Sequence, residues 1–129
     1  MPSENSPQNL ALTITFIDPD LTPEELDEDA VLLLEELSDR RDIESVDRIR
    51  DPHPPEGSMS VGGFLLGKIT ALVDVTNAKK VFEFLGERLV NKPVSLEVEG
   101  NGKKLKVTAN KVEDLGVIIQ QAKEFIEAS

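Results

Sequence analysis

The stretch LALTITFIDPDLTPEELDEDAVLLLEELS, residues 10–38, contains a strand pattern followed directly by a helix pattern. In residues 10–17 every second side chain is large and apolar, which predicts a β-strand with one buried face. Leu10, Leu12, Ile14 and Phe16 share one face, and Ala11, Thr13, Thr15 and Ile17 share the other. Asp18-Pro19-Asp20 then ends the strand, because proline and aspartate favour turns.

The helix begins with a strong local signal. Thr22 can act as the N-cap, Pro23 suits the first helical position, and Glu25 can close a capping box. The helix is predicted to run to about Ser38. Its buried stripe should comprise Leu26, Ala30, Leu33, Leu34 and Leu37.

Two further strand regions are predicted on the C-terminal side of this unit. Residues 42–50 form a weaker strand, and a bulge or a shorter strand is expected there because its apolar residues do not alternate. Residues 94–110 form a hairpin that turns at Asn101-Gly102, a pair that tolerates positive φ. The Pro- and Gly-rich residues 51–63 between these regions are predicted to be a loop.

Residues 63–90 are harder to assign. The apolar spacing over 64–73 and over 81–89 predicts two helices, or one kinked helix, and a strand over 64–73 is the alternative because ITALVDV is rich in β-branched residues. A last helix is predicted after Asn110, with Glu113 closing its capping box. The predicted fold is α+β, with about four strands in one layer, helices packed on it and the order βαβ-α(α)-ββ-α. Residues 10–128 would be one domain after a disordered tail, 1–9.

Composition and charge exclude several classes of protein. The 129 residues include no cysteine, so disulfides, zinc–thiolate sites and cysteine nucleophiles are excluded. No apolar run approaches the roughly 20 residues of a membrane span, and the N-terminus does not look like a secretory signal, so we expect a cytoplasmic protein with no membrane partner. The net charge is −11, and residues 18–51 hold 14 acids against four arginines. This acidity, with no Trp or Tyr, argues against nucleic acid as a partner.

The segment GGFLLGKIT, residues 62–70, matches part of a phosphate-binding loop. The pattern needs Ser or Thr directly after the lysine to hold magnesium, but Ile69 follows Lys68. We therefore expect a structural role for this segment and no nucleotide cofactor.

The acids at the start of the first helix resemble part of a calcium-binding loop, with Asp18, Asp20 and Asp29 as ligands. Such a loop needs Gly at its sixth place and Glu at its twelfth, where this chain has Pro23 and Asp29. These acids are better explained by their favourable interaction with the helix dipole, so no metal site is predicted.

The chain also offers few residues for catalysis. His53 is the only histidine and lies between two prolines, with no obvious nucleophile beside it. Glu97 and Glu99 share one face of a hairpin strand, which we interpret as a solvated face. No catalytic residue is predicted, and the protein is expected not to be an enzyme.

Val31 and Leu32 widen the apolar stripe of the first helix beyond what one sheet face needs. Either this helix is fully buried, or the two side chains form a patch that binds a partner. Under the second hypothesis, Val31 or Leu32 lies at an interface with an effector or a second copy. The rim would be acidic, formed by Glu28, Glu35 and Glu36.

The order of these features resembles the effector-associated constant component family of bacteria. The resemblance rests on the acidic first helix, SVDRIRDPHPPEGSMSVGGFLLG, FLGERL and VSLEVEGNGKKLKVTAN, and it covers roughly residues 10–127. It implies a small non-enzymatic subunit of bacterial conflict (immunity) systems. Such a subunit would accompany an effector, such as a trypsin-like or caspase-like protease, and could also form homo-oligomers.

The family has no established active-site motif, so the resemblance transfers no functional residues. Three alternatives remain at the level of sequence. The chain could be a small-ligand-sensing domain, a stand-alone protein-interaction domain, or a hydrolase that uses His53.

Overall fold

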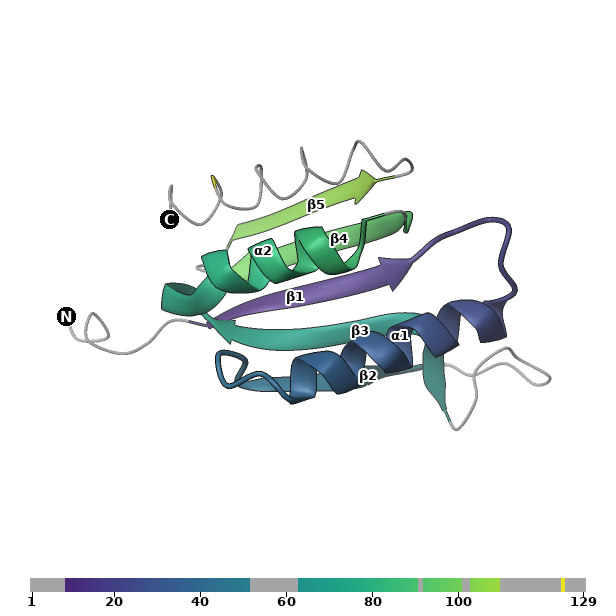
Figure 1. Cartoon of the computed structure of the whole chain (residues 1–129), viewed down its shortest axis with the longest axis horizontal. Helices are drawn as coiled ribbons and strands as arrows, with labels where there is room; N and C mark the ends of the chain where they lie inside the picture. The colour runs from purple at the N-terminus through teal and green to yellow at the C-terminus, as the bar shows by residue number, and fades with distance from the viewer. Residues whose placement is uncertain (1–8, 52–62, 91, 101–102, 110–123, 125–129) are drawn as a thin grey trace.

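The computed structural model describes residues 9–51, 63–90, 92–100, 103–109 and 124 (Figure 1). Five antiparallel strands form one sheet in the order β2-β3-β1-β4-β5. The strands are β1 (Asn9–Phe16), β2 (Ser45–Arg50), β3 (Phe64–Asp74), β4 (Val94–Gly100) and β5 (Lys103–Ala109). The helices are α1 (Pro23–Ser38) and α2 (Ala78–Arg88), and a short 3-10 turn, η2 (Val75–Asn77), precedes α2.

The connections between strands form two split βαβ units. Helix α1 connects β1 to β2, and β3 lies between these two strands; helix α2 connects β3 to β4, and β1 lies between them. This is the ferredoxin-like arrangement, to which β5 adds a strand at the edge beside β4. The predicted α+β class is confirmed, and the sheet has five strands instead of about four.

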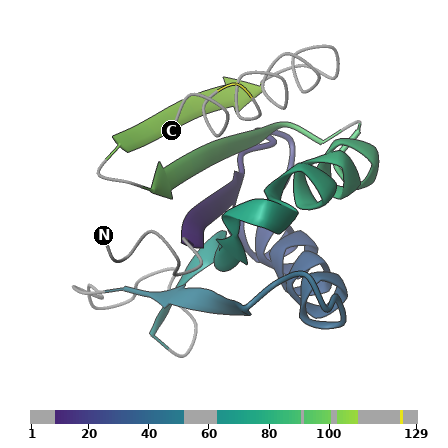
Figure 2. The same ribbon diagram turned by 90° about the vertical axis from the view of Figure 1, so that its left-hand side faces the viewer.

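One core lies between the sheet and both helices. The helices lie on the same side of the sheet (Figure 2). The alternation predicted for β1 is confirmed, because Leu10, Leu12, Ile14 and Phe16 are all buried on that side. Helix α1 contributes Ala30, Leu33 and Leu37 to the core, and α2 contributes Ala78, Val81, Phe82 and Leu85.

The predicted start of α1 is confirmed in detail. The hydroxyl of Thr22 accepts a hydrogen bond from the Glu25 backbone N–H at 3.1 Å, and Glu25 Oε1 accepts one from the Thr22 N–H at 2.8 Å. Pro23 occupies the first turn. These bonds satisfy backbone donors that a helix start otherwise leaves without partners.

Replacing Thr22 with alanine is therefore expected to lower the free energy of unfolding by about 1 kcal/mol. The alanine removes the acceptor for the first-turn amide but leaves the core stripe unchanged. Urea denaturation followed by circular dichroism measures this loss. Thr22→Ser, which keeps the hydroxyl, is the control, and equal stability of the two variants would contradict the role of the cap.

Residues 64–74 form a strand, so the predicted helix over this segment is wrong and the alternative holds. Strand β3 pairs with β1 on one edge and with β2 on the other. Ile69, Ala71 and Val73 alternate and are buried, whereas Leu72 lies on the opposite side and is partly exposed. The second predicted helix is present as α2, and Asp74 caps the turn before it by accepting from the Thr76 N–H at 2.8 Å.

A bulge explains why the alternation in β3 is hidden in the sequence. Arg48 pairs with Ile69 and Arg50 with Phe64, so the single residue between the arginines on β2 is matched by the four residues 65–68 on β3. Gly67 lies inside this bulge with a φ of 74°, a conformation that L side chains rarely adopt. Its N–H donates to Asp27 Oδ1 on α1 at 3.0 Å. The extra residues lie in β3, so the bulge expected in the second strand is wrong. The alternative of a shorter strand holds, because β2 begins at Ser45 instead of residue 42.

The hairpin of β4 and β5 is confirmed, with Val94 opposite Ala109 and Gly100 opposite Lys103. The turn at Asn101-Gly102, the loop that contains His53, and all of the helix predicted after Asn110 except Glu124 lie outside the described residues. The predicted tail also lies outside them except for Asn9, where β1 begins. In the described part of the chain, neither helix combines the length and apolarity needed to cross a bilayer.

Candidate functional site

Helix α1 carries a shallow apolar hollow on the surface that it turns away from the sheet. The hollow has a volume of about 420 Å³. It is lined by Asp27, Glu28, Val31, Leu32 and Glu35, all from one helix. Asp27, Val31 and Glu35 are spaced four residues apart and form one ridge, while Glu28 and Leu32 form the next.

The apolar part of the hollow is Leu32 with Val31. Leu32 is 51% exposed, one of three large apolar side chains with high exposure in the described residues, and Val31 is half-buried. The sheet-facing residues of α1 already fill the core, so neither side chain is needed there. The interpretation of α1 as fully buried is therefore wrong.

The acidic rim agrees with the sequence hypothesis only in part. Glu28 and Glu35 are exposed and line the hollow. Glu36 does not line it, because its carboxylate pairs with the guanidinium of Arg88 and so joins α1 to α2. The physical reason is helix geometry: a residue one position after Glu35 is rotated by about 100° around the helix axis.

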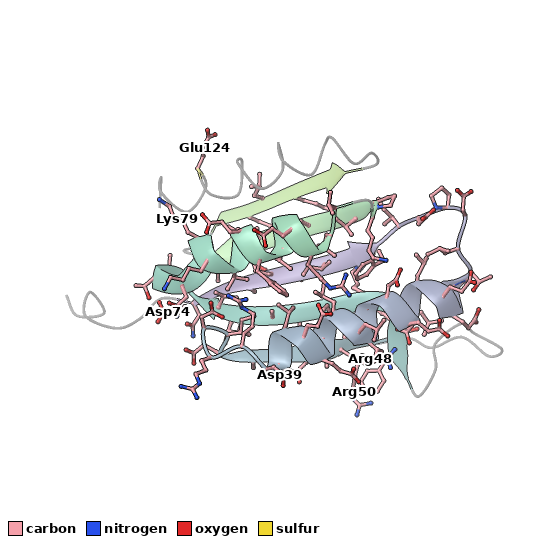
Figure 3. All side chains as sticks on the ribbon, in the orientation of Figure 1. Asp39, Arg48, Arg50, Asp74, Lys79 and Glu124 are labelled. Atoms are coloured by element: carbon pink, nitrogen blue, oxygen red, sulfur yellow. The ribbon has the colours of Figure 1, made fainter. Side chains whose placement is uncertain are left out.

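Asp27 is the lining residue that sequence reasoning missed. Both of its oxygens lie 2.6 Å from Arg48 Nη2 on β2, and Oδ1 also accepts from the Gly67 N–H. The guanidinium of Arg48 lies 5.0 Å from the centre of the Phe64 ring, and that of Arg50 lies 5.2 Å from it (Figure 3). Asp27 thus forms the inner wall of the hollow and fixes α1 against β2 and β3.

The phosphate-loop resemblance fails on structure as well as on sequence. A phosphate-binding loop leads from a strand into a helix, but Lys68 lies within strand β3. Gly67 serves the bulge, where a Cβ atom would lie 3.1 Å from the Cβ of Leu26.

The acids that resemble calcium ligands have structural roles. Asp18 Oδ1 accepts from the Asp20 N–H at 2.9 Å, which closes a local turn. Asp29 lies 3.4 Å from Lys92 Nζ and so ties α1 to the segment before β4. Across the described ranges, no group of three or more acidic, histidine or cysteine side chains is placed to hold a metal ion.

Glu97 is not simply solvated, as the sequence had suggested. Its Oε2 lies 2.6 Å from Nζ of Lys104 on the neighbouring strand β5. The hydrogen bond from Lys104 lowers the pKa of Glu97, and the nearby charges of Lys104, Lys106 and Lys68 lower that pKa further. Glu97 therefore stays ionised on the side of the sheet opposite the helices.

The hollow on α1 is the site closest to a sequence prediction, since four of its five lining residues, all except Asp27, were named in the sequence analysis for their surplus of apolar and acidic character. Its chemistry is that of a docking surface, with an apolar centre and a charged rim. Comparison of the chain with protein-family models, with curated proteins and with solved structures finds no match.

Proposed function

We propose that this chain is a non-enzymatic adaptor that docks a partner protein through the hollow on α1. The proposed partner is an effector of the protease type in a bacterial conflict system, as the family resemblance implies. The observation that carries the docking proposal is Leu32, a large apolar side chain that is half exposed at the centre of an acidic surface.

The charge of the hollow indicates what kind of segment it binds. Glu28 and Glu35 flank Leu32 and form no ion pair within the described part of the chain. A matching partner surface presents an apolar anchor between lysines or arginines. Apolar anchors supply most of the lasting affinity, and complementary charges accelerate encounter.

The test measures binding to the protein encoded by a protease-type effector gene adjacent to the gene for this chain. Leu32→Asp is expected to weaken binding by about 30-fold or more, the loss typical of a central interface residue. Val90→Asp is the matched control, since Val90 is also an exposed apolar side chain and is not part of the hollow. This control should bind like the parent protein.

Circular dichroism and melting temperature establish that both variants fold. If Leu32→Asp fails to fold, Glu28→Lys combined with Glu35→Lys takes its place. Reversing these two charges should slow association, and raising the salt concentration should slow the parent in the same way because exposed charges are screened beyond about 8 Å. A folded Leu32→Asp variant with parental affinity would overturn the proposal. So would a parent that dimerises through this surface, a result that sedimentation would reveal.

A further inference from the structure

The side of the sheet opposite the helices has polar side chains at its centre. Thr13 and Thr15 on β1 lie on this side, because their neighbours Leu12, Ile14 and Phe16 point into the core. Figure 2 shows both helices on the other side of the sheet. Neither α1 nor α2 covers this side, which is called the open face below.

The open face has a hollow of about 270 Å³ over β3, β1, β4 and β5. The strand register arranges its polar residues in two rows across the sheet. In one row Lys68 lies opposite Thr15, and Thr15 lies opposite Ser95. In the other row Thr13 lies opposite Glu97, and Glu97 lies opposite Lys106. The complete lining is Thr13, Thr15, Ile17, Lys68, Ser95, Glu97 and Lys106.

The rows place a lysine at each end of a polar floor that consists of hydroxyl groups and the carboxylate of Glu97. Neighbouring strands are about 4.8 Å apart, so Lys68 on β3 and Lys106 on β5 lie on opposite sides of Thr15 and Ser95. Both side chains are long enough to extend inward over this floor. The hydroxyl groups can donate hydrogen bonds, and the ammonium groups add positive charge.

The local charge of the open-face hollow is opposite to that of the whole chain, which carries −11. Glu97 already holds Lys104, which lies just outside the lining. Neither Lys68 nor Lys106 has an ion-pair partner among the residues that the structure describes. The lining therefore has two lysines without an ion-pair partner; both also lie near Glu97, whose ion pair is with Lys104.

We propose that the open-face hollow binds a small anionic metabolite through a carboxylate or phosphate group. The anionic group lies between Lys68 and Lys106, and the hydroxyls of Thr13, Thr15 and Ser95 donate to its oxygens. Glu97 can accept a hydrogen bond from a hydroxyl or amine elsewhere on the ligand. The volume is smaller than the roughly 300–1,000 Å³ of sites for drug-sized molecules, so the ligand is smaller than a nucleotide.

This proposal does not depend on the docking surface. The open face and the hollow on α1 share no lining residue, so one can fail while the other holds. If both hold, the chain would be an adaptor that also senses a small molecule.

The test titrates the full-length, nitrogen-15-labelled chain separately with inorganic phosphate and with succinate, at constant ionic strength set by sodium chloride. Saturable NMR shifts are expected for the amides of Thr13, Thr15 and Ser95. Saturation by phosphate alone assigns a phosphate-bearing ligand, and saturation by succinate alone assigns a carboxylate. Absence of saturation with both probes overturns the proposal.

Matched lysine variants distinguish specific binding in the hollow from nonspecific electrostatic attraction to the protein. Lys68→Gln and Lys106→Gln should each weaken binding about tenfold, whereas Lys80→Gln should not change it. Lys80 is an exposed lysine on α2, on the other side of the sheet, so it provides the same change of charge away from the hollow. Equal weakening by all three variants would show nonspecific attraction and would overturn the proposal. An intact β1 amide spectrum in each variant confirms that the fold is retained.

Discussion

Replacing Phe82 with alanine is expected to lower the free energy of unfolding by about 3–5 kcal/mol, the largest loss that we expect from a single substitution in this chain. Phe82 lies on α2, is 0% exposed and is the largest fully buried side chain in the described residues. Alanine would remove most of its contacts and leave a cavity between α2 and the sheet. Proteins of this size are usually stable by about 5–15 kcal/mol, so the variant should be close to unfolding at 37 °C.

Urea denaturation measures this loss as a lower midpoint with an unchanged slope. Phe84→Ala is the matched control, because Phe84 is on the same helix but is only partly buried, with Arg40 over its ring at 4.6 Å. Phe84→Ala should cost at least 1 kcal/mol less than Phe82→Ala. Phe84 buries less apolar area in the folded protein, and each Å² of buried apolar area contributes about 25 cal/mol. Equal losses in the two variants would contradict the placement of Phe82 at the centre of the core.

Asp27→Ala is expected to have the second largest effect, a loss of about 2–3 kcal/mol. The Asp27 carboxylate accepts from Arg48 on β2 and from the Gly67 backbone in the bulge of β3. Its removal leaves the Gly67 N–H without this acceptor and the guanidinium of Arg48 without its ion pair. Arg48 is only 23% exposed, so water compensates for the lost pair incompletely. Breaking a fully buried pair would cost more.

The control for Asp27→Ala is Glu28→Ala, which removes an exposed carboxylate from the next position of the same helix. Its effect should stay within about 0.5 kcal/mol. Asp27→Asn adds a second comparison, because it keeps an oxygen for Gly67 but loses the charge that faces Arg48, and its loss should be intermediate. A stability of Asp27→Ala equal to that of Glu28→Ala would show that the contact with Arg48 and Gly67 contributes nothing.

Features that depend on neighbouring residues could be predicted from the sequence. The capping box of α1 involves residues three positions apart, so the choice of Thr22, Pro23 and Glu25 is sufficient to place the helix start. The alternation of β1 is equally local, since a period of two assigns each side chain to one face before any partner strand is known. The hairpin of β4 and β5 follows from the same kind of pattern.

The assignment of β3 needed the tertiary structure. Its apolar residues do not alternate through the bulge at Gly67, and the resulting spacing imitates a helix. β3 pairs with β1 on one edge and with β2 on the other, and this pairing stabilises a strand where the local spacing favours a helix. Tertiary context here overrides local preference. The conformation of Gly67 and its hydrogen bond to Asp27 exist only because α1 lies across the bulge.

The candidate sites divide in the same way. The surplus of apolar and acidic residues on α1 is a periodicity within one helix, so Val31, Leu32, Glu28 and Glu35 could be proposed from the sequence. The ion pair of Glu36 with Arg88 could not be predicted from the sequence. Arg88 lies 52 residues away, and only the packing of α1 beside α2 brings the two side chains together. The open-face hollow joins Lys68 to Lys106 through the register of four strands. The sequence alone determines which side chains share a face of β1 and where α1 begins. The tertiary structure decides which faces and side chains meet. The reason is that strand register and helix packing depend on residues far apart in the chain.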